Sequence, residues 1–212
     1  DWSSDVCSSD LNIFFRSSFF GLLIFSSLQA SAETWVVDSS HSRVGFEVEH
    51  MMITTVKGQF GEFSGVFETN QKTELISLSG EVSVLSVDTN DPKRDGHLQT
   101  PDFFKAEAFP LMKFSGSKVT GSHAKGYTVE GKLTIRDVTK TVTLSLSPIT
   151  GPIVDGWGNT KIGTAGSTTI NRKDFGVNWN NTLDEGGLVV GEEVRIILDL
   201  QLVKKKRRLR IV

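Results

Sequence analysis

Apolar and polar side chains alternate along much of the chain after residue 33. The clearest run places Val194, Ile196, Leu198, Leu200 and Leu202 at every second position, with mostly polar residues between them. Successive side chains of a β-strand point to opposite faces, so a period of two puts these apolar side chains on one face. The pattern predicts a half-buried antiparallel strand.

Shorter runs of the same kind recur upstream, over residues 44–48, 76–84, 133–135 and 142–146. About eight strands with largely sequential turns, each apolar on one face, fit either an up-and-down barrel or a sandwich. The pattern leaves closure open. A closed barrel of about eight strands is just wide enough to hold one small apolar ligand.

Residues 87–110 interrupt the alternation and contain three of the five prolines. Long connections between strands are often functional. Within this connection we predict a short helix over residues 101–108, with Thr100 as its N-cap and Pro101 at its first position. Residues 51–57 are predicted to form a second short helix or a turn.

The amino-terminal part of the chain is read as lying outside the fold. Residues 1–11 repeat Ser-Ser-Asp without an apolar period and are interpreted as an artefact or a disordered segment. Residues 12–32 combine Arg16, an apolar run and Ala30-Ser31-Ala32, which are the three parts of a secretory signal peptide. A membrane anchor is the alternative, but a helix of about ten apolar residues reaches roughly 15 Å, against a hydrocarbon core of about 30 Å. We therefore predict a periplasmic or secreted protein.

Net charge and cysteine content argue against several classes of function. A net charge of -2 gives no general attraction to nucleic acid. The single cysteine, Cys7, precedes the predicted cleavage point, so the mature chain is expected to lack thiol catalysis and thiolate metal sites. We predict one domain over residues 33–203 and a basic tail over residues 204–212. The tail is interpreted as solvated, with attraction to anionic lipid as the alternative.

The four histidines raise the question of a metal site. No pair has the H-E-x-x-H spacing, and His41 and His50 are an odd number of residues apart, hence on opposite faces of any one regular strand. We predict no metal and no cofactor. Ser40 beside His41 suggests a nucleophile with its base, but neighbouring side chains of an extended chain point apart and no G-x-S-x-G elbow occurs. We therefore predict that the protein is not an enzyme.

Five segments together carry a family resemblance. They are WVVDSSHSRVGFEVEH (35–50), GQFGEFSG (58–65), RDGHLQTPDFF (94–104), GKLTIRDVTKTV (131–142) and NRKDFGV (171–177). In this order and spacing the chain resembles the YceI family. The resemblance implies an all-β, lipocalin-like antiparallel β-barrel of about eight strands with short helical insertions. It also implies export and the binding of polyisoprenoid or related amphiphilic lipids. Asp137 departs from the glycine that is usual in the turn of the fourth segment.

The segment around Arg94 is the candidate for contact with a lipid headgroup. Arg94, Asp95 and His97 place a cation, a carboxylate and an imidazole within four residues. A local salt bridge that pins the connection is one interpretation, and contact with an anionic or polar headgroup at a barrel mouth is the other. Phe103 and Phe104 follow, either as a lid on a lipid tail or as a plug of the barrel end. Glycines in the second segment are expected to permit sharp coiling or close approach to a ligand.

From these observations we predict non-catalytic binding, for transport or storage, of a polyisoprenoid or similar long-chain amphiphile in the barrel interior. The predicted lipid-binding residues are Val44, Phe46, Val48, Phe60, Phe63, Phe103, Phe104 and Phe114, and the headgroup candidates are His50, Arg94 and His97. The lipid is the predicted partner, and nucleic acid is not. The alternatives are an enzyme that acts on a lipid-like substrate through the histidine, arginine and aspartate groups, and a stress-related interaction protein that uses the barrel as a scaffold.

Overall fold

The computed structural model describes residues 32–181 and 188–206. Its strands are β1 (Glu33–Val37), β2 (Arg43–His50), β3 (Thr54–Phe60), β4 (Phe63–Thr69), β5 (Leu75–Ser83), β6 (Val87–Asp88), β7 (Leu111–Ser122), β8 (Gly126–Ile135), β9 (Val138–Leu146), β10 (Thr150–Val154), β11 (Thr160–Asn171) and β12 (Val190–Lys204). Between them lie the helix α1 (Pro92–Gln99) and the short 3-10 segments η1 (Ser39–His41), η2 (Val84–Ser86) and η3 (Arg172–Phe175).

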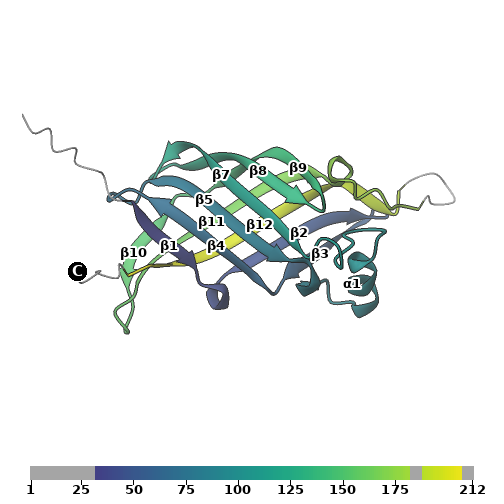
Figure 1. The fold of residues 1–212 in the computed structure, drawn as a ribbon, viewed down its shortest axis with the longest axis horizontal. Coiled ribbons are helices and arrows are strands. Elements are labelled where there is room, and N and C mark those ends of the chain that lie inside the picture. Colours follow the sequence, from purple (N-terminus) through teal and green to yellow (C-terminus); the bar gives the residue numbers. More distant parts are fainter. Residues whose placement is uncertain (1–31, 182–187, 207–212) are drawn as a thin grey trace, which may run out of the picture.

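Eight antiparallel strands close into a barrel in the order β11, β9, β8, β7, β5, β4, β1 and β12, because β12 pairs again with β11. The β11–β12 ladder runs from Lys161 opposite Val203 to Asn171 opposite Glu193. Figure 1 shows the strands inclined to the long axis of the molecule. The predicted barrel is therefore confirmed, and the sandwich is excluded.

Along one edge of β12, the sheet splits into two branches, one that starts with β1 and one that starts with β2. β1 pairs with residues 202–204 of that strand, and β2 pairs with residues 190–199, so the two lie end to end along one edge. β1 leads on to β4 and β5, whereas β2 leads on to β3 and β6. No ladder joins β3 to β4 in the described part of the chain. α1 lies on the β3 side of this division, at one end of the molecule (Figure 1).

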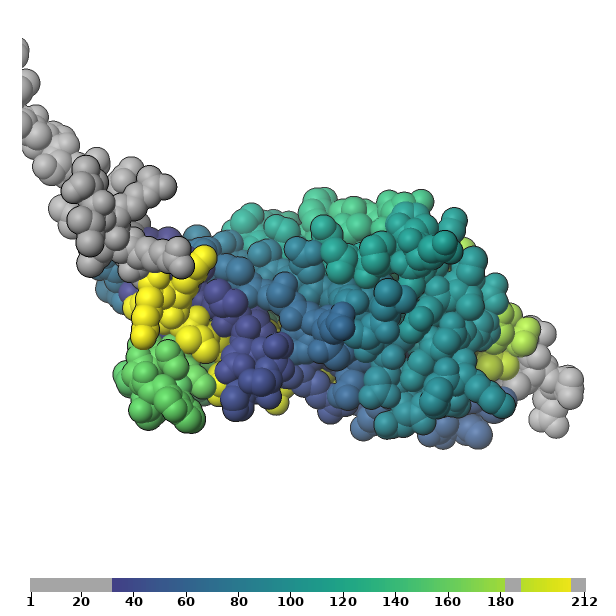
Figure 2. All heavy atoms as spheres, turned by 60° about the horizontal axis from the view of Figure 1, so that its bottom comes forward, coloured from purple at the N-terminus to yellow at the C-terminus, as the bar shows by residue number. Residues whose placement is uncertain are grey.

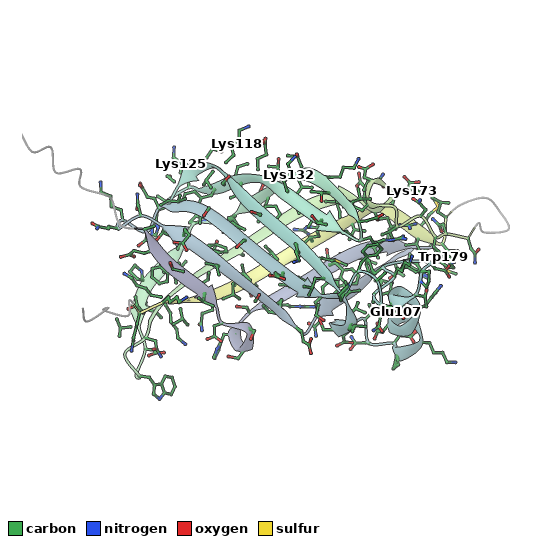
Figure 3. The ribbon with its side chains drawn as sticks, viewed as in Figure 1. Glu107, Lys118, Lys125, Lys132, Lys173 and Trp179 are labelled. Atoms are coloured by element: carbon green, nitrogen blue, oxygen red, sulfur yellow. The ribbon has the colours of Figure 1, made fainter. Side chains whose placement is uncertain are left out.

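Two clusters of buried apolar side chains lie inside the barrel. One is built around Trp35, Phe67 and Leu202, and the other around Phe103 and Phe175. The alternating side chains of β12 contribute to both clusters, which is why that strand is apolar at every second residue. Outside the barrel, Figure 3 shows charged side chains such as Lys118 and Lys132 directed into the surroundings.

The predicted helix over residues 101–108 is wrong, because the helix spans Pro92–Gln99 instead. Asp91 caps it by accepting from the backbone N–H groups of Lys93 and Arg94, and Pro92 stands in its first turn. Thr100, predicted as the N-cap, is the C-cap residue. Of the short helix or turn predicted over residues 51–57, the structure has the turn, but only over residues 51–53, because β3 begins at Thr54.

Residues 1–31 and 207–212 lie outside the described residues. The artefact segment, the signal peptide and most of the basic tail therefore stay predictions, and so do the domain bounds. Lys204 is the last residue of β12, so the strand runs one residue past the predicted end of the domain. Within residues 32–181 and 188–206, no helix combines the length and the apolar character needed to span a bilayer.

Candidate functional site

An apolar cavity of about 220 Å³ lies inside the barrel. Its walls come from the inward faces of the strands and from the connection between β5 and β7. All eight residues predicted to contact lipid line it, namely Val44, Phe46, Val48, Phe60, Phe63, Phe103, Phe104 and Phe114. Their contact with a lipid stays a prediction. For Val44, Phe46 and Val48, the period of two predicted one shared face of the strand, and that face lines the cavity.

Phe46 shows how the sequence shapes the cavity wall. It lies opposite Gly58 in the β2–β3 ladder, and its ring centroid lies 5.6 Å from that of Phe60. A Cβ atom added to Gly58 would lie 2.3 Å from the Cζ atom of Phe46, so the ring occupies the space that a side chain would fill. The group that approaches this glycine closely is therefore the side chain of Phe46, whereas the approach expected there was that of a ligand.

Residues 84–110, which we call the lid, close the cavity with Leu98, Phe103 and Phe104. Arg136, in the β8–β9 turn, holds this segment by donating from Nη1 to the carbonyl oxygen of Phe103 at 3.2 Å and to that of Gly176 at 2.8 Å. The arrangement fits the predicted role of Phe103 and Phe104 as a cover for the barrel interior.

His97 takes part in an aromatic cluster on the lid. Its ring meets those of Phe103 and Trp179 edge-on, with centroids 5.0 and 4.9 Å away. Its Nε2 atom lies 2.9 Å from Oδ2 of Asp102. Figure 3 shows Trp179 beside α1. The cluster thus fastens α1 to the segment that follows η3.

Arg94 and Asp95 both turn toward Thr89 instead of toward each other. Arg94 donates from Nε to the hydroxyl of Thr89 and from Nη2 to its carbonyl oxygen, both at 2.7 Å. Asp95 accepts from the backbone N–H and the hydroxyl of the same residue. Neither Arg94 nor the other headgroup candidates, His50 and His97, is among the described residues that line the cavity. Their headgroup role stays a prediction.

Arg172 is the site residue that the sequence did not single out. Its side chain lies beside the apolar cavity, and the residue is only 5 % exposed. Its donors reach four backbone carbonyl oxygens, those of Val177, Trp179, Val190 and Gly191, at 2.7 to 3.2 Å. Burial lowers the pKa of the guanidinium. The side chain ties the segment after η3 to the start of β12, at the lid end of the cavity.

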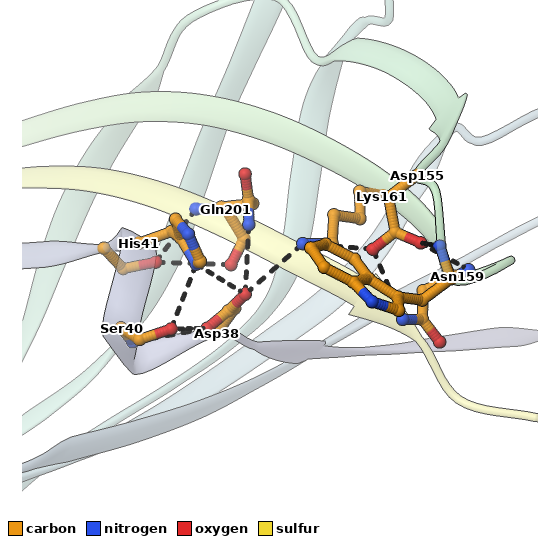
Figure 4. A network of polar contacts seen from close by, with 9 residues as sticks. Asp38, Ser40, His41, Asp155, Asn159, Lys161 and Gln201 are labelled. Carbon is orange, nitrogen blue, oxygen red and sulfur yellow. Dashed lines mark hydrogen bonds and ion pairs between the residues drawn. The ribbon is translucent and has the colours of Figure 1, made fainter.

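The expectation that Ser40 and His41 point apart is wrong. Both lie in η1, a 3-10 turn, where Ser40 Oγ is 3.0 Å from His41 Nδ1 and donates to Oδ1 of Asp38 at 2.6 Å. The Asp38 carboxylate also lies 3.0 Å from the same Nδ1 atom (Figure 4). In a hydrolase triad, the histidine contacts the nucleophile through one ring nitrogen and the acid through the other. Here Ser40 and Asp38 both contact Nδ1 of His41.

Hydrogen bonds stabilise the ionised form of the Asp38 carboxyl. The Ser40 hydroxyl, with further hydrogen bonds from His41 and Gln201, lowers the pKa of this carboxyl to about 2. None of Asp38, Ser40 and His41 lines the cavity. Over residues 32–181 and 188–206, no three His, Cys, Asp or Glu side chains gather where they could hold a metal ion. Metal independence stays a prediction.

Comparison with known proteins places this architecture among relatives. A family model described as the YceI-like domain matches residues 35–202. A UPF0312 protein of Yersinia enterocolitica is 34 % identical over 189 residues, which are 88 % of this chain and 94 % of the relative. A UPF0312 protein of Shewanella baltica is 31 % identical over 76 % of this chain and 85 % of its own length.

Solved structures agree with this family match. A YCEI protein of Campylobacter jejuni is similar with a TM-score of 0.63 and 30 % identity, over 80 % of this chain and 96 % of that one. A domain from Saccharophagus degradans, described as a polyisoprenoid binding domain, has a TM-score of 0.56 and 13 % identity, over 81 % of this chain and 98 % of that one. At this identity, the second likeness shows the fold alone.

Proposed function

The chain belongs to the family of YceI-like domains, and from this premise we propose that it binds a polyisoprenoid or similar long-chain amphiphile inside its barrel without changing it chemically. The observation that carries the proposal is the cavity, whose walls are built from apolar side chains of the strands and the lid. The polyisoprenoid-binding domain of Saccharophagus degradans, which shares the fold, supports this choice of ligand class.

The driving force is the burial of the lipid tail. Each methylene moved out of water contributes roughly 0.8 kcal/mol, so about ten buried carbons contribute several kcal/mol before the costs of association. The cavity volume of about 220 Å³ is below the roughly 300–1,000 Å³ of pockets for compact drug-sized ligands. A slender chain suits such a space better than a fused ring system does.

The location of the lid favours entry and exit at the α1 end. The lid is a connection between strands, and it contributes Leu98, Phe103 and Phe104 to the cavity wall. Its displacement exposes the interior without breaking a ladder of the closed barrel, since β6 pairs only with β3 in the described chain. A headgroup at this end remains close to water, as an amphiphile requires.

We favour binding over the enzymatic alternative because the groups suited to catalysis are used otherwise. Arg94 and Asp95 are engaged with Thr89, and Ser40 and Asp38 share one nitrogen of His41. The scaffold hypothesis gives no reason for an apolar cavity. Transport or storage is the role that fits binding without turnover, and residues 12–32 support a periplasmic or secreted location.

Extraction of the purified protein followed by mass spectrometry of the extract tests the proposal. We expect a co-purified long-chain lipid in the wild-type protein and its loss in Phe46→Asp, with circular dichroism confirming that the barrel persists. Ile53→Asp is the matched control, because Ile53 is 83 % exposed. Chemical conversion of added polyprenyl lipid by the wild-type protein would support the enzyme instead. A protein that neither contains nor retains lipid would contradict the proposal.

A further inference from the structure

A second apolar surface lies outside the barrel, on the hairpin formed by β10 and β11. All five residues of β10 are exposed. Ile153 is 63 % exposed, Val154 69 % and Trp157, in the turn that follows, 84 %. No other large apolar side chain in the described chain is more exposed than Trp157. Exposed apolar side chains gathered on one element mark an interaction site more often than isolated ones do.

The turn that presents Trp157 is held in place by polar contacts. The Asp155 carboxylate accepts from the backbone N–H groups of Trp157 and Asn159, both at 2.9 Å. Lys161 lies 3.4 Å from this carboxylate and 3.7 Å from that of Asp38, which connects the hairpin to β1 and η1 (Figure 4). The tryptophan is therefore exposed on a pre-organised turn, which reduces the entropy lost when it binds.

Basic residues lie next to this hairpin. Ile153 is opposite Lys161, and Lys161 is opposite Val203 of β12, so the last residues of β12 run alongside. Lys204 follows, then the exposed Lys205 and Lys206. Figure 2 shows the hairpin, in green, and the end of β12, in yellow, together at one end of the molecule.

We propose that the β10–β11 hairpin and the adjoining basic residues dock the protein on the surface of an anionic lipid bilayer. Tryptophan with aliphatic side chains prefers the boundary between headgroups and acyl chains, and neighbouring lysines are attracted to anionic headgroups. A protein partner that extends the sheet fits less well, because Pro152 has no N–H to offer along the free edge of β10.

Docking of this kind sets the orientation of the barrel. The hairpin lies at the end of the molecule opposite α1 (Figure 1), so the lid faces away from the bilayer. Docking through the hairpin does not depend on what the cavity holds, and vesicle binding is measured without measuring cavity ligands.

Sedimentation with vesicles measures the binding. The vesicles contain phosphatidylcholine with about 30 % phosphatidylglycerol, which supplies the anionic charge, or phosphatidylcholine alone. We expect partition onto the anionic vesicles, weakened by high salt, with Trp157→Ala lowering the partition coefficient about tenfold because a buried indole is lost. Lys205→Gln and Lys206→Gln are each expected to lower it about fivefold on anionic vesicles.

Matched variants distinguish docking from general adhesion. Ile53→Ala removes an equally exposed apolar side chain from the β2–β3 turn, and Lys132→Gln removes an exposed charge from β8. Both are expected to bind like the wild type. All variants are prepared with the same amino terminus, verified by mass spectrometry, so that residues before Glu33 contribute equally. Absence of vesicle binding, or equal losses in Ile53→Ala and Trp157→Ala, would overturn the proposal.

Discussion

Replacement of Arg172 by methionine tests the structural role of the buried guanidinium. The change keeps a long side chain but leaves four carbonyl oxygens without their donors. Hydrogen bonds to a charged group contribute about 1.5–3 kcal/mol each, but these four act as one unit and the exposed carbonyls regain some water. We therefore expect a loss of about 3–5 kcal/mol in the free energy of unfolding, which is less than the sum for four independent hydrogen bonds.

Thermal unfolding followed by circular dichroism measures this loss. For a domain of this size, about 1 kcal/mol shifts the midpoint by roughly 2–4 °C, so we expect a decrease of roughly 6–20 °C. Arg195→Met is the control, because the Arg195 side chain is 57 % exposed and its contact with Glu47 spans 3.6 Å. That surface pair is expected to contribute about 0–1 kcal/mol. If both variants unfold at the same temperature, the stabilising role of Arg172 is refuted.

Three further predictions concern the fold and its pH dependence. Gly58→Val is expected to lower the stability by about 1–3 kcal/mol in urea unfolding, because the new side chain displaces the Phe46 ring; unchanged stability would contradict the packing described. The Asp38 carboxyl has a folded-state pKa of about 2 against an ordinary 3.8, so its stabilisation is present above about pH 4 and is lost as the pH falls toward 2. Asp38→Asn is therefore expected to remove about 1–2 kcal/mol of this pH dependence in acid titrations, and an unaltered profile would refute the assignment. Arg94→Ala is expected to destabilise the lid through loss of the Thr89 contacts, seen as faster amide exchange in residues 84–110, while binding of a neutral lipid changes little.

The sequence was most informative where one face of a strand is buried. A period of two determines which side of the wall a residue takes, whatever the neighbouring strands are. For this reason Val44, Phe46 and Val48 could be assigned to one face before their partners were known. Closure of the barrel is a different matter, because it depends on the pairing of β11 with β12 and has no local signal; it followed from the family resemblance.

The wrong predictions arose where a local sequence pattern is compatible with more than one structure. Asp91-Pro92 and Thr100-Pro101 are both a capping residue followed by proline, and the structure starts the helix at the first pair, where Arg94 and Asp95 bind Thr89. The role of Arg172 could not be read from its segment, NRKDFGV (171–177), because its partners are backbone carbonyls, which any sequence supplies. Ser40 and His41 approach each other because η1 is a tight turn, whereas the prediction assumed an extended chain.

Photo-crosslinking with a polyprenyl lipid that carries a diazirine at the end of its tail locates the bound chain. Peptide mapping of the crosslinked protein then identifies the residues that the tail reaches. We predict crosslinks to residues deep in the cavity, such as Phe67, Leu78 and Leu200, competed by unlabelled lipid and lost in Phe46→Asp. Crosslinks confined to the outer surface, for example to the β10–β11 hairpin, would contradict binding inside the barrel.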